Sequence, residues 1–422
     1  MNAPHRISAA AILFFCLLAL PAAAQKLLIP MDNAQREHLK AYGIAYWALK
    51  RNIPVDWLLN YRGGAFMMDW SDVAAAECRI RGVTFQQVGG ADAASIYSEV
   101  QSNDKNMDLV RLETAARIAV YVPPTFQPWD DAVTMVLEYA EIPYDKIWDR
   151  EVLEGRLAGY DWLHLHHEDF TGQFGKFWAS YSNAPWYQQQ VAMLQTTAQE
   201  LGFAKVSQLK LAVAQKIRKY VSDGGFLFAM CSATDTYDIA LAAAGTDICD
   251  AVFDGDPPAA NAQSALDFSQ TLVFENFQVE FDPYIYEYAN IDVLPPPGGR
   301  AADKFTLFDF SAKQDPVPTM LTQCHVGVVT GFMGQTTAFH KRFIKKGITI
   351  LAEREGTDEA KYVTGNLDRG TFTFYGGHDP EDYQHAVGDP PTDMKLHPNS
   401  PGYRLILNNI LFPSARKKKL KT

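Results

Sequence analysis

One cysteine of this chain lies where a nucleophile would be expected, directly after an apolar run. Residues 226–230, Phe-Leu-Phe-Ala-Met, are typical of a buried strand and end at Cys231. A nucleophile elbow needs small residues on both sides of the nucleophile because its strand-to-helix turn is tight, and Ala229 and Ala233 meet that need. The helix expected next should lower the pKa of the thiol, and the Ser232 N–H could help to stabilise an oxyanion. The alternative is that Cys231 is a small buried side chain that only packs.

A histidine follows a second strand-like run near the end of the chain. Residues 370–375, Gly-Thr-Phe-Thr-Phe-Tyr, lead through two glycines to His378, Asp379, a proline and Glu381. An imidazole can take the proton of a thiol, and a carboxylate can orient that imidazole. Because parallel strands end at one edge of a sheet, we expect His378 to meet Cys231 there.

A third group of polar side chains, His-Leu-His-His-Glu-Asp, closes another short apolar run. In a strand, His164 and His166 face one side, because successive side chains alternate. His167 and Glu168 would then enter the crevice and contact a substrate or an oxyanion. We expect no cofactor, but two alternatives stay open: the histidines have no function, or a divalent metal binds to His164, His166 and His167, together with His378 or Cys231.

Together these motifs resemble the class I glutamine amidotransferase-like superfamily, in which a cysteine follows a central strand and His-x-Pro-Glu follows a late one. Residues 374–381, Phe-Tyr-Gly-Gly-His-Asp-Pro-Glu, followed by an asparagine-containing terminal helix, are closer to its ThuA-like branch. The resemblance covers residues 117–412. It implies Cys231 as the nucleophile and His378 as its general base.

One position departs from the family pattern. The family's acid follows the histidine by two residues, where this chain has Pro380. Asp379 or Glu381 is therefore expected to serve instead.

Strand-like and helical segments alternate along the chain, which predicts an α/β protein. The expected fold is a mostly parallel, doubly wound sheet of the flavodoxin-like, glutamine amidotransferase-like type, with an additional N-terminal α/β unit and an insertion. In the N-terminal unit, residues 25–115, we expect strands at 26–31, 55–59 and 83–88 and helices at 38–49 and 93–101. In the main domain, residues 116–412, we expect strands at 117–122, 146–148, 160–165, 226–230, 347–351 and 370–375 and helices at 130–142 and 204–222. Residues 254–317, rich in Pro, Gly and Ala, are interpreted as the insertion, with strand-like pieces at 272–274 and 284–286.

The first 24 residues are typical of a secretory signal peptide. They contain Arg6, an apolar run over residues 9–20, and Pro21 before three alanines. No later segment offers about 18 uninterrupted apolar residues, so we expect no transmembrane anchor after cleavage. The expected location is periplasmic or secreted.

Charge and cysteine content exclude some classes of protein. With 38 basic and 49 acidic residues, the net charge is −11, so we do not expect the protein to bind nucleic acid, which is itself negatively charged. The basic tail, residues 413–422, is interpreted as solvated. The cysteines beyond the signal peptide, Cys78, Cys231, Cys249 and Cys324, lack CxxC spacing, which argues against a disulfide framework.

Three functions remain open. The first is an exported Cys–His hydrolase or acyl-transfer enzyme for an amide, peptide or related small substrate. The second is a non-catalytic or carbohydrate-directed ThuA-like binding module, and the third is a metal-dependent enzyme that uses the histidine-rich strand end. The chain is also similar to an exported bacterial family often labelled asparagine synthetase B. The N-terminal cysteine and pyrophosphate loop of such synthetases are absent, so we do not expect that activity.

Overall fold

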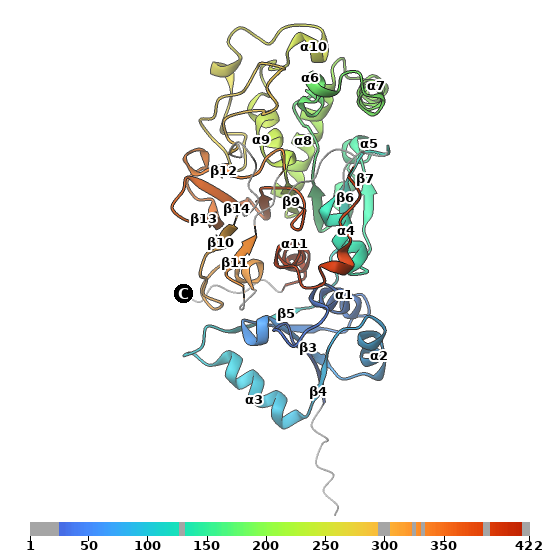
Figure 1. Ribbon diagram of the computed structural model, residues 1–422, viewed down its shortest axis with the longest axis vertical. Coiled ribbons are helices and arrows are strands. Elements are labelled where there is room, and N and C mark those ends of the chain that lie inside the picture. Colours follow the sequence, from blue (N-terminus) through green and yellow to red (C-terminus); the bar gives the residue numbers. More distant parts are fainter. Residues whose placement is uncertain are drawn as a thin grey trace, which may run out of the picture.

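The computed structural model describes residues 25–125, 131–293, 304–322, 326–330, 334–382 and 389–415. The expected signal peptide, most of the basic tail and Cys324 lie outside these ranges. The molecule is elongated, with the elements of the N-terminal unit at one end and α6 (Trp178–Tyr181), α7 (Pro185–Glu200) and α10 (Ala251–Asp254) at the other (Figure 1). Over the described residues, no helix is long and apolar enough to cross a membrane.

The N-terminal residues form an antiparallel sheet of five strands in the order β4-β1-β3-β2-β5. Its strands are β1 (Lys26–Ile29), β2 (Val55–Leu59), β3 (Ala65–Asp69), β4 (Gln86–Val88) and β5 (Asp108–Leu112). Its helices are α1 (His38–Leu49), α2 (Asp72–Ile80) and α3 (Gly90–Gln101). Only the second half of the strand expected at 83–88 is extended, and β3, β5 and α2 were not expected.

Helix α1 joins this sheet to the rest of the chain. Every residue of α1 except Lys40 is buried, and a helix that is buried all round must be covered on all sides. The covering helix is α11 (Pro401–Leu411), where the Tyr42 hydroxyl donates to Asn408 Oδ1 at 2.5 Å. Leu27 of β1 and Leu405 of α11 belong to one hydrophobic core, so the two parts of the chain pack as one body.

The second sheet is mixed and has the order β11-β10-β13-β14-β15-β9-β8-β6-β7, with β12 paired to β14. The parallel half consists of β6 (Ile118–Tyr121), β7 (Asp145–Ile147), β8 (Trp162–Leu165), β9 (Phe226–Met230) and β15 (Gly370–Tyr375). The antiparallel half consists of β10 (Lys304–Leu307), β11 (Val328–Thr330), β12 (Phe339–His340), β13 (Thr349–Arg354) and β14 (Glu359–Leu367). The fold is therefore α/β, but the sheet expected to be mostly parallel is parallel over only one half.

The segment expected as an insertion is partly built into this sheet. Strand β10 lies within residues 254–317 and pairs with β13. The expected strand at 272–274 forms only an isolated bridge, from Phe274 to Ile344. The expected strand at 284–286 is wrong, because the Asp282 carboxylate accepts the Tyr284 N–H at 2.9 Å and holds a turn there.

Helices cover both faces of the parallel half. Helices α4 (Ala132–Tyr139) and α11 share a core with Trp162 and Phe228 on one face. Helices α8 (Val206–Ser222) and α9 (Ser232–Ala242) share a core with Leu163 and Leu165 on the other, beside α5 (Asp149–Leu153). Side chains of one strand thus alternate between two cores, which leaves the carboxyl edge of the strands as the place for polar groups.

Candidate functional site

The three motifs meet at one edge of the sheet. Strands β8 and β15 lie on either side of β9, and all three run parallel. The residues that follow them are His166 and His167 after β8, Cys231 after β9 and His378 after β15. Residues more than 200 positions apart in sequence are therefore neighbours, as the spacing of the motifs predicted.

Cys231 sits in a strained turn between β9 and α9. Its φ is 49° and its ψ is −138°, a left-handed conformation that few residues other than glycine adopt. This sharp strand-to-helix turn is the geometry of a nucleophile elbow, which presents its side chain at the carboxyl edge. The small neighbours Ala229 and Ala233 are fully buried, as the tight turn requires.

The electrostatics of the thiol differ from expectation. Cys231 is 1% exposed, and burial raises the pKa of its thiol to about 11. Backbone N–H groups of Thr336, Ser232 and Gln335 point at the sulfur and lower the pKa, but by less than burial raises it. The lowered pKa expected from the helix N-terminus is therefore wrong, and the thiol is protonated at neutral pH.

His378 lies next to the sulfur. A β-carbon placed on Gly334 would be 2.9 Å from Cys231 Sγ and 3.1 Å from His378 Cβ. Both side chains therefore border the same small space, and His378 is 6% exposed. The segment beginning at Gly334 covers this space, so a side chain at that position would press on both residues.

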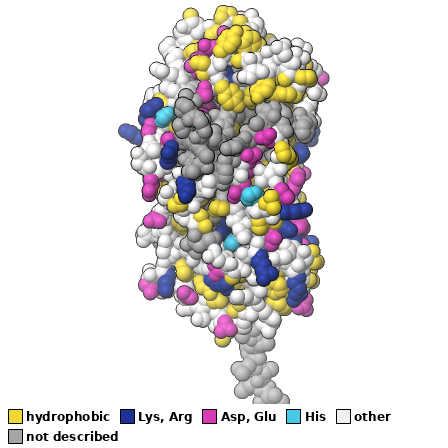
Figure 2. Space-filling model, viewed as in Figure 1, with side chains coloured by type: hydrophobic (Ala, Val, Ile, Leu, Met, Phe, Trp, Pro, Cys, Tyr) yellow, Lys and Arg dark blue, Asp and Glu magenta, His cyan; other side chains and the backbone are white. Residues whose placement is uncertain are grey.

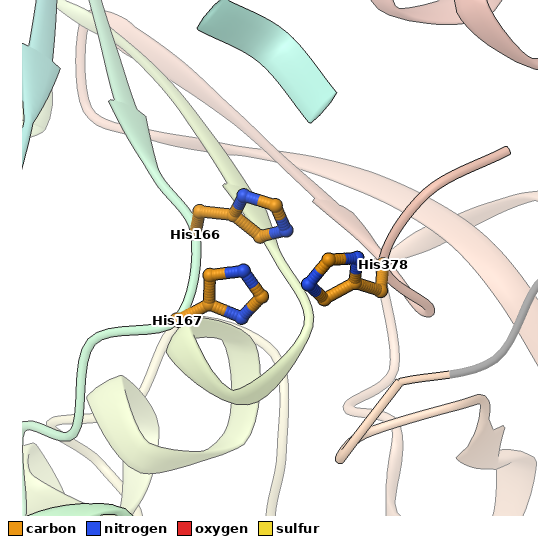
Figure 3. A group of neighbouring side chains, drawn as sticks. All are labelled: His166, His167 and His378. Carbon is orange, nitrogen blue, oxygen red and sulfur yellow. The ribbon is translucent and has the colours of Figure 1, made fainter. Parts of the chain in front are cut away.

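His166, His167 and His378 form a compact cluster of imidazoles (Figure 3). The ring centroids are 3.7 Å apart for His166 and His167, 4.1 Å for His167 and His378, and 4.8 Å for His166 and His378. One nitrogen of each ring lies within 4.8 Å of the others. A metal site that joins the histidines after β8 to His378 was one of the alternatives expected from the sequence, and the fold brings these three rings together.

Asp131, the N-cap of α4, faces two of the strand-end histidines. Its Oδ2 is 3.3 Å from His164 Nε2, and its Oδ1 is 3.5 Å from His166 Nδ1. Burial alone would raise the pKa of Asp131, but the two histidines hold it well below its usual range. Burial also lowers the pKa of His166, although Asp131 opposes this. His164 also lies 3.2 Å from the Phe228 carbonyl, so its ring is held on the Asp131 side.

Glu168 borders a small cleft with about 20 Å³ of free space, which is room for about one water molecule. Burial raises the pKa of Glu168 to about 8, so its carboxyl group is protonated at neutral pH and can donate a hydrogen bond. Glu168 Oε2 is 2.6 Å from the His166 backbone nitrogen, which donates to it. The cleft is lined by residues that follow β6, β7 and β8 and by α7 and α8, among them Pro123, Trp148, His167, Phe174, Phe177 and Lys210.

The two acids after His378 have different partners. Asp379 is fully buried, and its Oδ1 accepts the Glu381 N–H at 2.9 Å. Its negative charge also raises the pKa of His166. Glu381 Oε2 lies 3.4 Å from His397 Nδ1. Asp379 therefore acts on His166, and Glu381 contacts His397. At the thiol, Ser232 contributes its backbone N–H.

Two residues at the site were missed by the sequence reasoning. Asp131 could have been found from the sequence, because it begins the helix after the first parallel strand and so lies at the carboxyl edge of the sheet. Gly334 could not have been found in this way, since it lies in a segment without regular structure. Cys78 and Cys249, like Cys231, are buried free thiols.

No family model matches the chain, and no curated protein matches it. Among solved structures, cytoplasmic protein STM3548 from Salmonella typhimurium aligns over 71% of this chain and 100% of its own, with 10% identity and a TM-score of 0.35. Cytoplasmic protein STM1381 from Salmonella typhimurium LT2 aligns over the same shares, with 12% identity and a TM-score of 0.35. A beta-galactosidase from Bacillus circulans sp. alkalophilus aligns over 64% of this chain and 29% of its own, with 12% identity and a TM-score of 0.27. Likenesses this weak assign neither a family nor a function.

Proposed function

We propose that this protein is an exported Cys–His hydrolase or acyl-transfer enzyme that acts on an amide, peptide or related small substrate. The observation that carries the proposal is the left-handed backbone of Cys231, with φ of 49°, at the turn between β9 and α9. A non-glycine residue held in this conformation is costly to a fold, by about 1–3 kcal/mol, and such strain clusters at functional sites. His378 borders the same space as the sulfur.

The proposed reaction begins from a neutral thiol, with His378 as the base. His378 accepts the Cys231 proton as the sulfur attacks the substrate carbonyl carbon. The N–H groups of Ser232, Gln335 and Thr336, which point at the sulfur, would stabilise negative charge on the sulfur as it loses its proton. His378 then returns the proton to the leaving nitrogen as the tetrahedral intermediate collapses to a thioester. Water or another nucleophile cleaves the thioester and restores the thiol.

The order of the parallel strands supports the proposed fold class. Numbered along the chain, β7-β6-β8-β9-β15 is the order 2-1-3-4-5, which is that of flavodoxin-like doubly wound sheets. In such sheets ligands bind where the strand order reverses, here between β6 and β8. The cleft bordered by Pro123 and Glu168 lies at that place. We therefore assign the chain to the glutamine amidotransferase-like class. The cleft reaches the site at His167, whereas Cys231 and His378 do not line it.

The test is covalent trapping with an activated ester. Intact-mass measurement should find one acyl group per protein, and peptide mapping should place it on Cys231. The Cys231→Ala variant should take up none, whereas Cys249→Ala, which removes another buried free thiol, should behave as the parent. Acylation that persists in Cys231→Ala, or a parent that stays unmodified while a small thiol reagent also fails to react, would exclude the enzyme.

A second candidate, a carbohydrate-directed binding module, is favoured by aromatic side chains beside the cleft. Phe177 lies 5.8 Å from Tyr286 and Trp178 lies 5.3 Å from Tyr284, between ring centroids. Tyr284 is 72% exposed, and hydrophobic side chains gather at this end of the molecule (Figure 2). Aromatic faces can pack against sugar rings. A thermal-shift panel of oligosaccharides tests this candidate, with Tyr284→Ala expected to remove any stabilisation.

A further inference from the structure

The three imidazoles at the carboxyl edge come from two strands that do not pair with each other. His166 and His167 follow β8, and His378 follows β15, with β9 between them. One nitrogen from each ring lies within 4.8 Å of the other two, so a small inward movement would bring all three onto one ion. Figure 3 shows the rings turned toward a common centre.

The surroundings of His166 point to a ligand. The residue is 1% exposed, and its Nε2 has no hydrogen-bond partner among the described residues. A buried polar group without a hydrogen bond is rare and needs an explanation. Asp131 Oδ1 lies 3.5 Å from His166 Nδ1, as a carboxylate does when it orients a metal-binding histidine from behind. This arrangement leaves Nε2 for an ion.

The donor set selects the kind of ion. Three imidazole nitrogens with no carboxylate among them suit Zn²⁺ and neighbouring transition metals, whereas Mg²⁺ and Ca²⁺ require oxygen ligands. We infer that His166, His167 and His378 bind one divalent ion of the Zn²⁺ type. The consequence for the thiol rests on the proposed function: an ion bound to one nitrogen of His378 withdraws electron density from the ring and weakens it as a base for the Cys231 proton. The metal therefore switches the thiol chemistry off.

The site itself is tested by metal binding, without reference to activity. Protein without a histidine tag, stripped with a chelator, is dialysed against Zn²⁺ and analysed by mass spectrometry of the metal, and Co²⁺ is added separately to record visible absorption. We expect one ion per chain and the bands of tetrahedral Co²⁺. His166→Ala and His167→Ala should each weaken binding at least about tenfold, as removal of a ligand or its support does. His340→Ala should not, because His340 pairs with Asp358 away from the cluster.

Thermal unfolding of each variant separates loss of the site from loss of the fold, and His167, the most exposed of the three, gives the mildest change. Binding that is unchanged in His167→Ala, or that is lost equally in His340→Ala, would overturn the site. Failure of the parent to take up any ion would do the same.

The switch is tested by acylation of Cys231 with and without Zn²⁺. At a Zn²⁺ concentration that just saturates the parent, acylation of the parent should slow to the rate of His378→Ala, whereas acylation of His167→Ala should slow much less. If Zn²⁺ slows both proteins equally, the ion acts on the sulfur and the switch is wrong. If the parent binds Zn²⁺ but Cys231 is never acylated, the proposed function fails while the metal site stands.

Discussion

The reactivity of Cys231 toward a small alkylating reagent should depend steeply on pH. Burial raises the pKa of its thiol to about 11, so at pH 8 only about one thiol in a thousand is ionised. The thiolate is the reacting form. Between pH 7 and pH 10 the rate of alkylation by iodoacetamide should therefore rise about tenfold per pH unit without levelling off. An exposed thiol, with a pKa of about 8.5, would level off above pH 9.

The assay is peptide mapping after timed exposure to reagent, with circular dichroism at each pH to verify that the fold persists. Cys78 is the internal control, because burial raises the pKa of its thiol to about 12 and it should react more slowly still. His378→Gln should leave the tenfold rise per pH unit unchanged, because iodoacetamide reacts with thiolate formed by ionisation in solution and needs no general base. A rate that is already constant between pH 6 and pH 8 would refute the reasoning. Such a plateau would mean that sulfur and imidazole form a resting ion pair.

Three other outcomes are expected. Burial raises the pKa of Asp235 from 3.8 to about 7, so the stability it contributes is present below pH 3.8 and is lost as the pH rises through 7. Urea unfolding should find Asp235→Asn more stable than the parent at pH 8, by about 4 kcal/mol at most, and equal to it near pH 4. In the parent, the Lys210 ammonium group lies 2.9 Å from the buried Asp149 carboxylate. Lys210→Met removes this charged partner and should lower the free energy of unfolding by about 3–5 kcal/mol in the same assay. Gly334→Ala should slow acylation of Cys231 about tenfold or more in the mass assay, because the new β-carbon would lie 2.9 Å from the sulfur.

Much of the parallel half could be predicted from local pattern. The runs at 226–230 and 370–375 are strands with the expected bounds, β9 and β15. Both runs are apolar, lie in the interior of the sheet and are bounded by glycine or by the start of a helix. A few residues are therefore enough to predict each strand. Strand β14 was missed, because its sequence contains Lys361 and Asn366 and its extended form depends on pairing with β13 and β15. Strand β10 was missed for the same reason, since only pairing with β11 and β13 distinguishes it from the Pro-rich residues before it.

For the site, the sequence by itself determined which reactive side chains follow which strands: His166 and His167, Cys231, and His378. Local backbone preference and alternation fix that much, because they act over a few residues. Only the tertiary structure decided that Gly334 covers the sulfur, that Asp131 faces His166, and that the thiol pKa is raised rather than lowered. Burial and the contacts between distant segments depend on how the whole chain packs, and desolvation is the larger influence on a buried thiol.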